Sequence, residues 1–357
     1  MTNEYPDQPA PSSGAHRLPK GVHLVGSVPL GSAEEVFRTT SSLLGEQLRR
    51  LPDGETGIRS GWIGWQFQVF ASNPLFEMVA PPPNTYGARA RIKLRSPRTP
   101  DALTFEQLGY ADAALDSYRL FSQLKRDGVI PAHYRFQVCL PTPLAPVSAF
   151  VVQEDQAEVE PVYEAALLSE LDRITSSVPQ NDLAIQWDTA IEFAILEGVM
   201  PTFLAESKAD ILARLLRLGQ RVPVPAELGY HLCYGDAGHT HFKEPEDTGK
   251  LVEIANALSA GLTRPLNWIH LPVPRNRSDA AYYAPLRHLR LHPETELYLG
   301  VVHFTDGVEG TLKRIQAAQQ VVGDFGVATE CGFGRRPADT IPAVLHIHSQ
   351  VADPVSA

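Results

Sequence analysis

The sequence predicts an α/β fold, a single (β/α)8 TIM barrel with an insertion after its first strand. Short apolar runs alternate along the chain with stretches of helical period, which is typical of a parallel sheet wrapped by helices. No apolar run leads into a glycine-rich phosphate-binding turn, and this favours a barrel over an open nucleotide-binding sheet. The chain has 357 residues, 43% of them hydrophobic, enough for one domain of this size.

Seven apolar runs are the predicted strands. They span residues 21–28, 134–140, 183–188, 227–234, 266–273, 296–304 and 325–333. Predicted helices at 161–178, 208–220, 249–262 and 308–322 repeat apolar residues at intervals of three and four. We expect the eighth strand within residues 88–95, unless the long insertion over residues 29–104 displaces it.

The first 19 residues differ in composition from the rest of the chain. Residues 1–19 are rich in Pro, Ser and other polar residues without an apolar period, which predicts a flexible tail. Residues 20–357 are expected to form one domain, because no fixed repeat and no proline-rich linker divides them.

Charge and cysteine content narrow the class of protein. A net charge of -10 and the lack of any run of Lys and Arg argue against nucleic acid as a partner. Three cysteines are too few for a disulfide framework, so a reducing cytoplasm is the expected location. No secretion signal and no stretch of about 18 apolar residues occurs, which predicts a soluble protein without a membrane span. The sequence does not indicate an oligomeric state.

One His and two Cys at the ends of predicted strands form a candidate metal site. Strand alternation points His231 and Cys233 to the same side. Cys331 ends another predicted strand, and in a barrel such strand ends meet at one rim. Zinc prefers thiolate and imidazole ligands, and a catalytic site keeps one exchangeable position. A buried Cys in a strand is also commonly a small hydrophobic residue, so a purely structural role is the alternative.

The motifs around these residues resemble those of a known family. HLCYGD (231–236) and ECGFGRR (330–336) are similar to the paired metal motifs of the cobalamin-independent methionine synthase family, in its C-terminal catalytic barrel. HLVGSVP near the start and LAIQWDTAIEFAILEG (183–198) resemble two further segments of that family in the same order. The resemblance spans roughly residues 20–345.

The resemblance implies roles for individual residues. His231, Cys233 and Cys331 would bind zinc. Gly26 and Ser27 would cradle a thiol substrate, and Asp188 would face its polar head, in the family an amino group.

Four residues depart from the family pattern. His270 stands where the family has a zinc-binding Glu, and it is either a second imidazole ligand or a core residue. Thr189 and Ala190 replace an expected Glu-Pro pair. His303 is an approximate counterpart of the family's proton-transferring His and is the second predicted catalytic residue beside Asp188.

Charged and aromatic residues gather in the segment 51–66, which we interpret as a pocket lid with Arg59 and Trp62 as substrate contacts. Its Pro-Asp-Gly sequence alternatively marks a plain turn. Arg275 and Arg277 fit either binding of a carboxylate or phosphate or a solvated loop.

Other His and Cys residues are predicted to be structural. His239 and His241 are expected in a solvated loop, and His346 and His348 in a terminal helix. Cys139 is expected to be buried in a strand.

The sequence therefore predicts a zinc-dependent transferase that ionises a small thiol and moves an alkyl group, methyl first of all, onto its sulfur. Zinc is the expected cofactor, with a small thiol and an alkyl donor as partners. The alternative within the same superfamily is a zinc-dependent lyase, or an enzyme that forms or cleaves a thioether. A third hypothesis is a barrel that binds zinc for structure alone, with four protein ligands.

Overall fold

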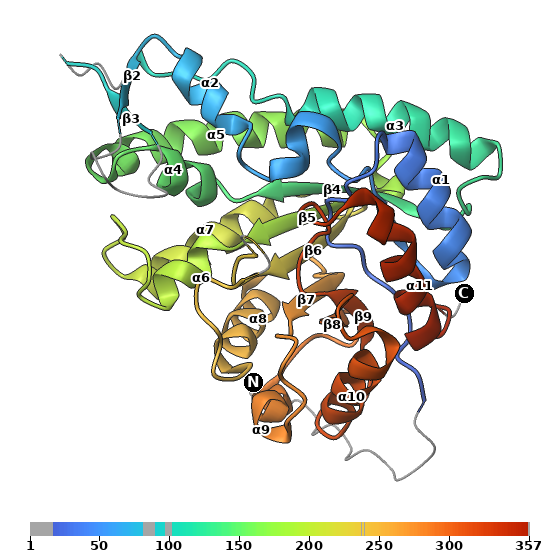
Figure 1. Cartoon of the computed structure of the whole chain (residues 1–357). Helices are drawn as coiled ribbons and strands as arrows, with labels where there is room; N and C mark the ends of the chain where they lie inside the picture. The colour runs from blue at the N-terminus through green and yellow to red at the C-terminus, as the bar shows by residue number, and fades with distance from the viewer. Residues whose placement is uncertain (1–16, 81–89, 97–101, 237, 239, 356–357) are drawn as a thin grey trace.

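A curled parallel sheet forms the centre of the molecule (Figure 1). The computed structural model describes residues 17–80, 90–96, 102–236, 238 and 240–355. Seven strands follow one another in the order β1-β4-β5-β6-β7-β8-β9, all parallel to their neighbours. They are β1 (Arg50–Pro52), β4 (Arg135–Pro141), β5 (Leu183–Thr189), β6 (Glu227–Leu232), β7 (Trp268–Pro272), β8 (Glu296–Val302) and β9 (Gly326–Thr329). This arrangement confirms the α/β class and a TIM-like curvature.

The first predicted strand is present as isolated bridges. Val22 bridges Leu48, just before β1, and also Val327 in β9, so it touches both edges of the sheet. Its amide donates to Gln47 O at 2.7 Å, and the amide of His23 donates to Val327 O at 2.9 Å. The chain segment that holds Val22 therefore lies between the first and last strands of the sheet.

The prediction of an eighth strand within residues 88–95 was wrong. The described part of that range forms β3 (Arg91–Leu94), which pairs antiparallel with β2 (Phe76–Val79) in a separate two-stranded sheet. The strand β1 was not predicted, because three residues are too short for an alternating pattern to stand out. Of the predicted flexible tail, residues 1–16 lie outside the described part of the chain.

Helices follow the strands and cover the outer face of the sheet (Figure 1). They are α1 (Ala33–Leu44), α2 (Gln66–Ser72), α3 (Tyr110–Arg126), α4 (Leu144–Phe150), α5 (Gln153–Ser177), α6 (Ile191–Leu196), α7 (Ser207–Gln220), α8 (Gly249–Gly261), α9 (Ala280–Tyr283), α10 (Gly307–Gln319) and α11 (Ile341–Val351). The four predicted helices correspond to α5, α7, α8 and α10. Helix α5 begins earlier than predicted, because its first turns bury polar groups such as Glu160, which pairs with Arg214 of α7 at 2.7 Å.

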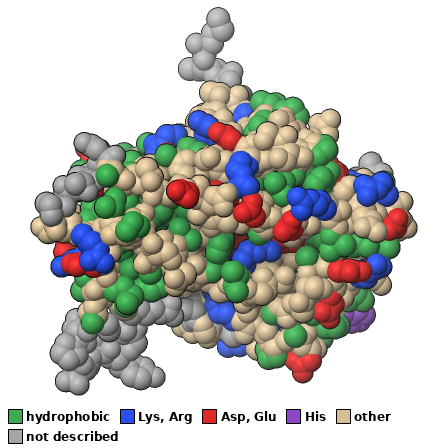
Figure 2. Space-filling view, turned by 90° about the horizontal axis from the view of Figure 1, so that it is seen from above, with side chains coloured by type: hydrophobic (Ala, Val, Ile, Leu, Met, Phe, Trp, Pro, Cys, Tyr) green, Lys and Arg blue, Asp and Glu red, His purple; other side chains and the backbone are tan. Residues whose placement is uncertain are grey.

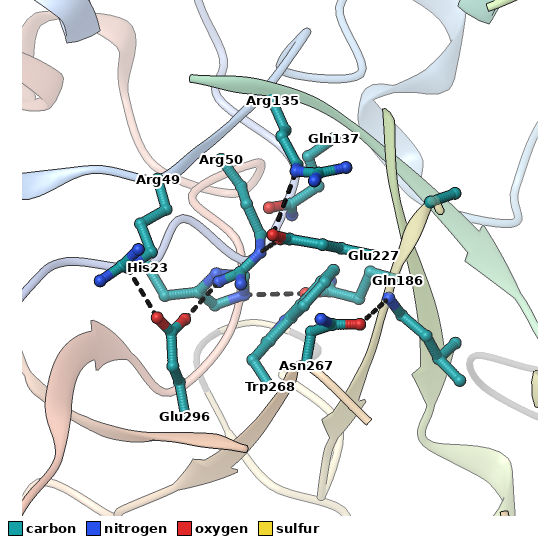
Figure 3. Close-up of polar contacts among 12 residues, drawn as sticks. His23, Arg49, Arg50, Arg135, Gln137, Gln186, Glu227, Asn267, Trp268 and Glu296 are labelled. Carbon is teal, nitrogen blue, oxygen red and sulfur yellow. Dashed lines mark hydrogen bonds and ion pairs between the residues drawn. The ribbon is translucent and has the colours of Figure 1, made fainter. Parts of the chain in front are cut away.

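A buried network of charges closes the amino-terminal end of the sheet (Figure 3). Arg50, the first residue of β1, pairs with Glu227 at the start of β6 and with Glu296 at the start of β8. Its guanidinium lies 4.2 Å from the ring centre of Trp268, which is fully buried. Gly229 makes room for that indole, since a Cβ on this glycine would lie 1.9 Å from the Trp268 ring. In barrels this end serves stability, and the opposite end carries function.

The face that α3 and α5 present carries mixed charges. Figure 2, which looks down on this face, shows positive and negative side chains next to one another. Arg173 of α5 pairs with Asp112 of α3 here. None of the described helices has the length and apolar character needed to cross a membrane.

Candidate metal and substrate site

The structure brings His231, Cys233 and Cys331 together. His231 lies on β6, Cys233 follows that strand directly, and Cys331 follows β9. One donor atom from each residue lies within 4.8 Å of the other two, and the two sulfur atoms are 3.9 Å apart. This is the convergence at the carboxyl-terminal rim that the sequence predicted.

Hydrogen bonds fix which nitrogen of His231 faces this site. Thr329 O can only accept, so His270 Nε2 donates to it at 3.0 Å. Burial lowers the pKa of His270 to about 3, so its ring is neutral and Nδ1 carries a lone pair. His231 Nδ1, 2.7 Å away, must then donate to His270. The pKa of His231 is lowered by burial and by His270, so its Nε2 is left with a free lone pair.

That nitrogen has no partner inside the described protein. His231 Nε2 is buried and accepts no hydrogen bond. A buried lone pair without a hydrogen bond costs free energy unless a ligand binds to it. In metal-binding His residues the ring is usually neutral, and the nitrogen that does not bind the metal donates a hydrogen bond. The donor set of one imidazole and two sulfurs therefore fits a zinc ion.

His270 lies behind His231 rather than beside the sulfurs. The two residues are register partners on β6 and β7, which places their rings side by side. Both ring nitrogens of His270 are engaged, one with His231 and one with Thr329 O. In this arrangement His270 orients the ring of His231, and its predicted role as a direct metal ligand stays a prediction.

The Cys233 thiol resists ionisation without a cation nearby. The pKa of Cys233 is raised first by its contact with Cys331 and then by burial. Two thiolates 3.9 Å apart repel each other, and a metal cation between them removes this repulsion. The pair of sulfur atoms and the free lone pair of His231 therefore both favour a bound metal cation.

A cavity of about 410 Å³ opens over these three residues. The predicted substrate residues Gly26, Ser27, Trp62 and Asp188 all line it. Apolar side chains form another part of the wall; they are Val25, Ala190, Ile191 and Phe242. Where the family has Glu-Pro, Thr189 instead bonds the carbonyl of His231 at 3.0 Å, and Ala190 presents a methyl group.

Two carboxyl groups share the cavity. Burial, followed by the charge of Glu55, raises the pKa of Asp188 well above its ordinary value. Burial and Asp53 raise the pKa of Glu55 to about 7, although Arg59 lowers it in part. A positively charged group placed between Glu55 and Asp188 would relieve this mutual repulsion. Glu55 belongs to the predicted lid segment, but its role in the site was not predicted.

Glu55 and Trp62 both adopt backbone conformations that side chains disfavour. Their φ angles are 48° and 57°, and they are the non-glycine residues with positive φ in the described part of the chain. Both line the cavity. Strain of about 1–3 kcal/mol at such positions persists where surrounding structure holds it, often at a functional site. Glu55 and Trp62 thus bring the segment 51–66 to the cavity, and its role as a lid stays a prediction.

Two predicted site residues lie apart from this cavity. Arg59 pairs with Asp53 at 2.7 Å behind Glu55. His303 lines a neighbouring cavity, and its Nε2 donates to Val273 O at 2.8 Å. The roles predicted for both residues stay predictions.

The remaining His and Cys predictions have mixed outcomes. The expectation of a solvated loop was wrong for His241, which is buried between Glu244 and Glu330 at 3.2 and 3.1 Å. His239 lies outside the described residues. The structure confirms a terminal helix, α11, at the two His residues near the end of the chain. Cys139 lies on β4, as predicted, but it is only partly buried.

Comparisons with known proteins agree with this geometry at the level of fold. The sequence matches no protein-family model and no curated protein. Two solved methionine synthase structures share the fold. A B12-independent methionine synthase from Shewanella sp. W3-18-1, in complex with selenomethionine, is 14% identical, with a TM-score of 0.56 over 93% of this chain and 96% of that one. A protein from Listeria monocytogenes, provisionally assigned to the same class, is 13% identical, with a TM-score of 0.53 over 95% and 100%. The resemblance found in the sequence is thereby confirmed for the fold.

Proposed function

We propose that this protein is a zinc-dependent transferase that moves an alkyl group, most simply methyl, onto the sulfur of a small thiol. One observation carries the proposal. Three soft donor atoms, including the unpartnered Nε2 of His231, converge at a cavity that two carboxyl groups also line. His231, Cys233 and Cys331 would hold the metal and leave a fourth position for substrate. The fold shared with methionine synthases supports the same reaction class.

Zinc in this position would lower the pKa of a bound substrate thiol, so that its sulfur is ionised and nucleophilic at neutral pH. The protein's own residues then hold and orient the substrate. In the overall reaction a bond forms between sulfur and the transferred carbon, and the bond between that carbon and the donor breaks. His303, in the neighbouring cavity, is the proposed proton carrier for the donor, although it does not line the metal cavity itself.

The thiol substrate would carry a protonated amine. Glu55 and Asp188 repel each other across the cavity, and an ammonium group between them would favour ionisation of both. The similar Shewanella structure contains selenomethionine, an amino acid with a methylated chalcogen, which supports an amino-acid thiol. Homocysteine meets both requirements, and its S-methylated product, methionine, is the sulfur counterpart of selenomethionine.

The backbone around Gly26 and Ser27 would complete the substrate site. We propose that residues 20–25 close the sheet as its eighth strand, since Val22 bridges both edges. This places the two residues that follow at the cavity, where the amide of Phe333 donates to Ser27 O at 2.7 Å. The turn after Cys331 is thereby tied to the first segment of the barrel.

Zinc analysis of cysteine variants tests the proposed ligand set. We expect about one zinc per chain in the wild type and in Cys139→Ser, and loss of most of the zinc in Cys331→Ser. Cys139 is the matched control, because it is the third cysteine and does not belong to the group of donor atoms. Full zinc loading of Cys331→Ser would contradict the proposal.

A second assay separates transfer from the lyase alternative. Ala190 and Ile191 make part of the cavity apolar, which also suits a thioether with an aliphatic arm. The zinc-loaded protein would be offered homocysteine with several methyl donors, and separately a set of thioethers. Product thioether in the first assay supports transfer, whereas elimination from the second set alone supports the lyase.

A further inference from the structure

A second cavity adjoins the metal cavity at the same rim. It has a volume of about 330 Å³ and receives side chains from the loops after β6, β7, β8 and β9. His241 lines both cavities. A small gap lined by Cys331 and Arg336 lies next to both, so a metal ligand and a guanidinium face the same space.

Two arginines in the second cavity have no carboxylate partner. Arg275 donates to the hydroxyl of Thr305 at 3.1 Å, and Arg336 lies 5.4 Å from the ring centre of Phe304. No carboxylate oxygen of the described residues forms an ion pair within 4.0 Å of either guanidinium. By contrast, Arg277 is committed elsewhere, since it pairs with Asp279 at 3.0 Å.

The carboxylates of this cavity are already paired with His241. Glu330 lies 3.1 Å and Glu244 lies 3.2 Å from its two ring nitrogens. Although burial lowers it, these two neighbours raise the pKa of His241 to about 9, so the ring is cationic at neutral pH. With His241 cationic, the lining holds three positive and two negative charges, so this cavity carries a net charge of +1.

Burial also makes the charge of Arg336 unfavourable. Its pKa is lowered by burial, and the more distant charges of Asp236 and Glu330 offset this only in part. A guanidinium recognises planar or tetrahedral oxyanions through paired N–H donors.

We propose that this second cavity is an oxyanion subsite, in which Arg275 and Arg336 bind a carboxylate or phosphate group of the alkyl donor. The identification of the bound molecule as the alkyl donor rests on the proposed transfer function. The oxyanion subsite itself is defined by its own residues. The thiol and the donor would then bind in different cavities because their charges differ. The acidic metal cavity takes the ammonium group of the thiol, and the basic cavity takes the anionic end of the donor.

Titration calorimetry with two simple probes, inorganic phosphate and succinate, tests the subsite. We expect the wild type to bind at least one probe at millimolar concentration, and Arg336→Gln and Arg275→Gln each to weaken that binding about tenfold. The tighter probe identifies which oxyanion the cavity prefers. Arg119→Gln is the matched control, since Arg119 is exposed on α3 and lines a different cavity; we expect it to bind as the wild type does.

The titration needs neither bound metal nor turnover, so its failure is distinct from failure of the proposed function. Zinc content and circular dichroism of each variant establish that folding and the metal site are intact. Absence of binding by the wild type would overturn the subsite even if zinc is fully loaded. Equal affinities of the wild type, Arg275→Gln and Arg336→Gln would overturn it as well, as would an equal loss in Arg119→Gln.

Discussion

Two hydrogen bonds determine the direction in which the free lone pair of His231 points. In this protein the lone pair of His231 Nε2 faces the metal cavity because Nδ1 donates to His270, which in turn donates to Thr329 O. Thr329 precedes Cys331 by two positions on the same stretch of chain. The hydrogen bonds that orient the His231 ring thus end on the stretch of backbone that also carries Cys331.

This arrangement makes His270 a positioning residue with a testable effect. His270→Phe removes the acceptor for His231 Nδ1 and is expected to weaken zinc affinity by about 10- to 100-fold. His270→Gln keeps an amide oxygen that can accept from His231 and an amide N–H that can donate to Thr329 O, so it should restore much of the affinity. Competition with a chromogenic chelator measures both constants. Equal affinities for Phe and Gln would show that the hydrogen bond plays no part.

Glu55 predicts a pH-dependent stability. Its pKa is about 7 in the folded protein against 4.5 for an ordinary Glu. The stabilisation from its protonated form is therefore fully present below about pH 4.5 and is lost as the pH rises through 7. Relative to Glu55→Gln, the free energy of unfolding of the wild type should fall by about 3 kcal/mol over this interval.

Urea unfolding at several pH values would measure this difference. Glu154→Gln, at an exposed position in the first turn of α5, is the control and should give a nearly constant difference from the wild type. A constant difference for Glu55→Gln as well would mean that Glu55 ionises freely in the folded protein.

At the scale of elements, strands and helices with a sustained apolar pattern were predicted from the sequence, and very short elements were missed. Long apolar runs such as those of β6 and β9 are visible because a buried parallel strand is apolar on both faces. The three residues of β1 carry no such signal. The first turns of α5 were missed because buried Glu160 disturbs the apolar period, its charge being balanced by an arginine from another helix.

The candidate site was predictable to a similar extent. The three proposed metal ligands could be found, because each stands at the end of an apolar run. The contact between His231 and His270 depends on the register of β6 against β7, which no local pattern encodes. The part played by Glu55 depends on a backbone with positive φ, which the residue type does not favour.

For the molecule as a whole, the charge network at the amino-terminal end is expected to contribute strongly to stability. Arg50→Met removes a buried guanidinium from its two partly buried partners, Glu227 and Glu296, and should lower the free energy of unfolding by about 3 kcal/mol. The neighbouring Arg49→Met is the matched control, since Arg49 pairs with Glu296 from an exposed position and should cost under about 1 kcal/mol.

Urea unfolding of both variants measures these values, and zinc content should be unchanged in each. Similar values for the two substitutions would mean that the buried position of Arg50 adds nothing to its ion pairs.

The charge network at the amino-terminal end also determines where ligands can enter and leave the interior of the sheet. Arg50 and Trp268 fill the interior of the sheet at one end, so any ligand of the cavity enters and leaves at the opposite rim. Cys233 lies deep, with 4% of its surface exposed, so a thiol beside it sits beneath anything bound nearer the opening. Under the proposed transfer reaction, the spent donor would therefore leave first, and the alkylated thiol would leave after it.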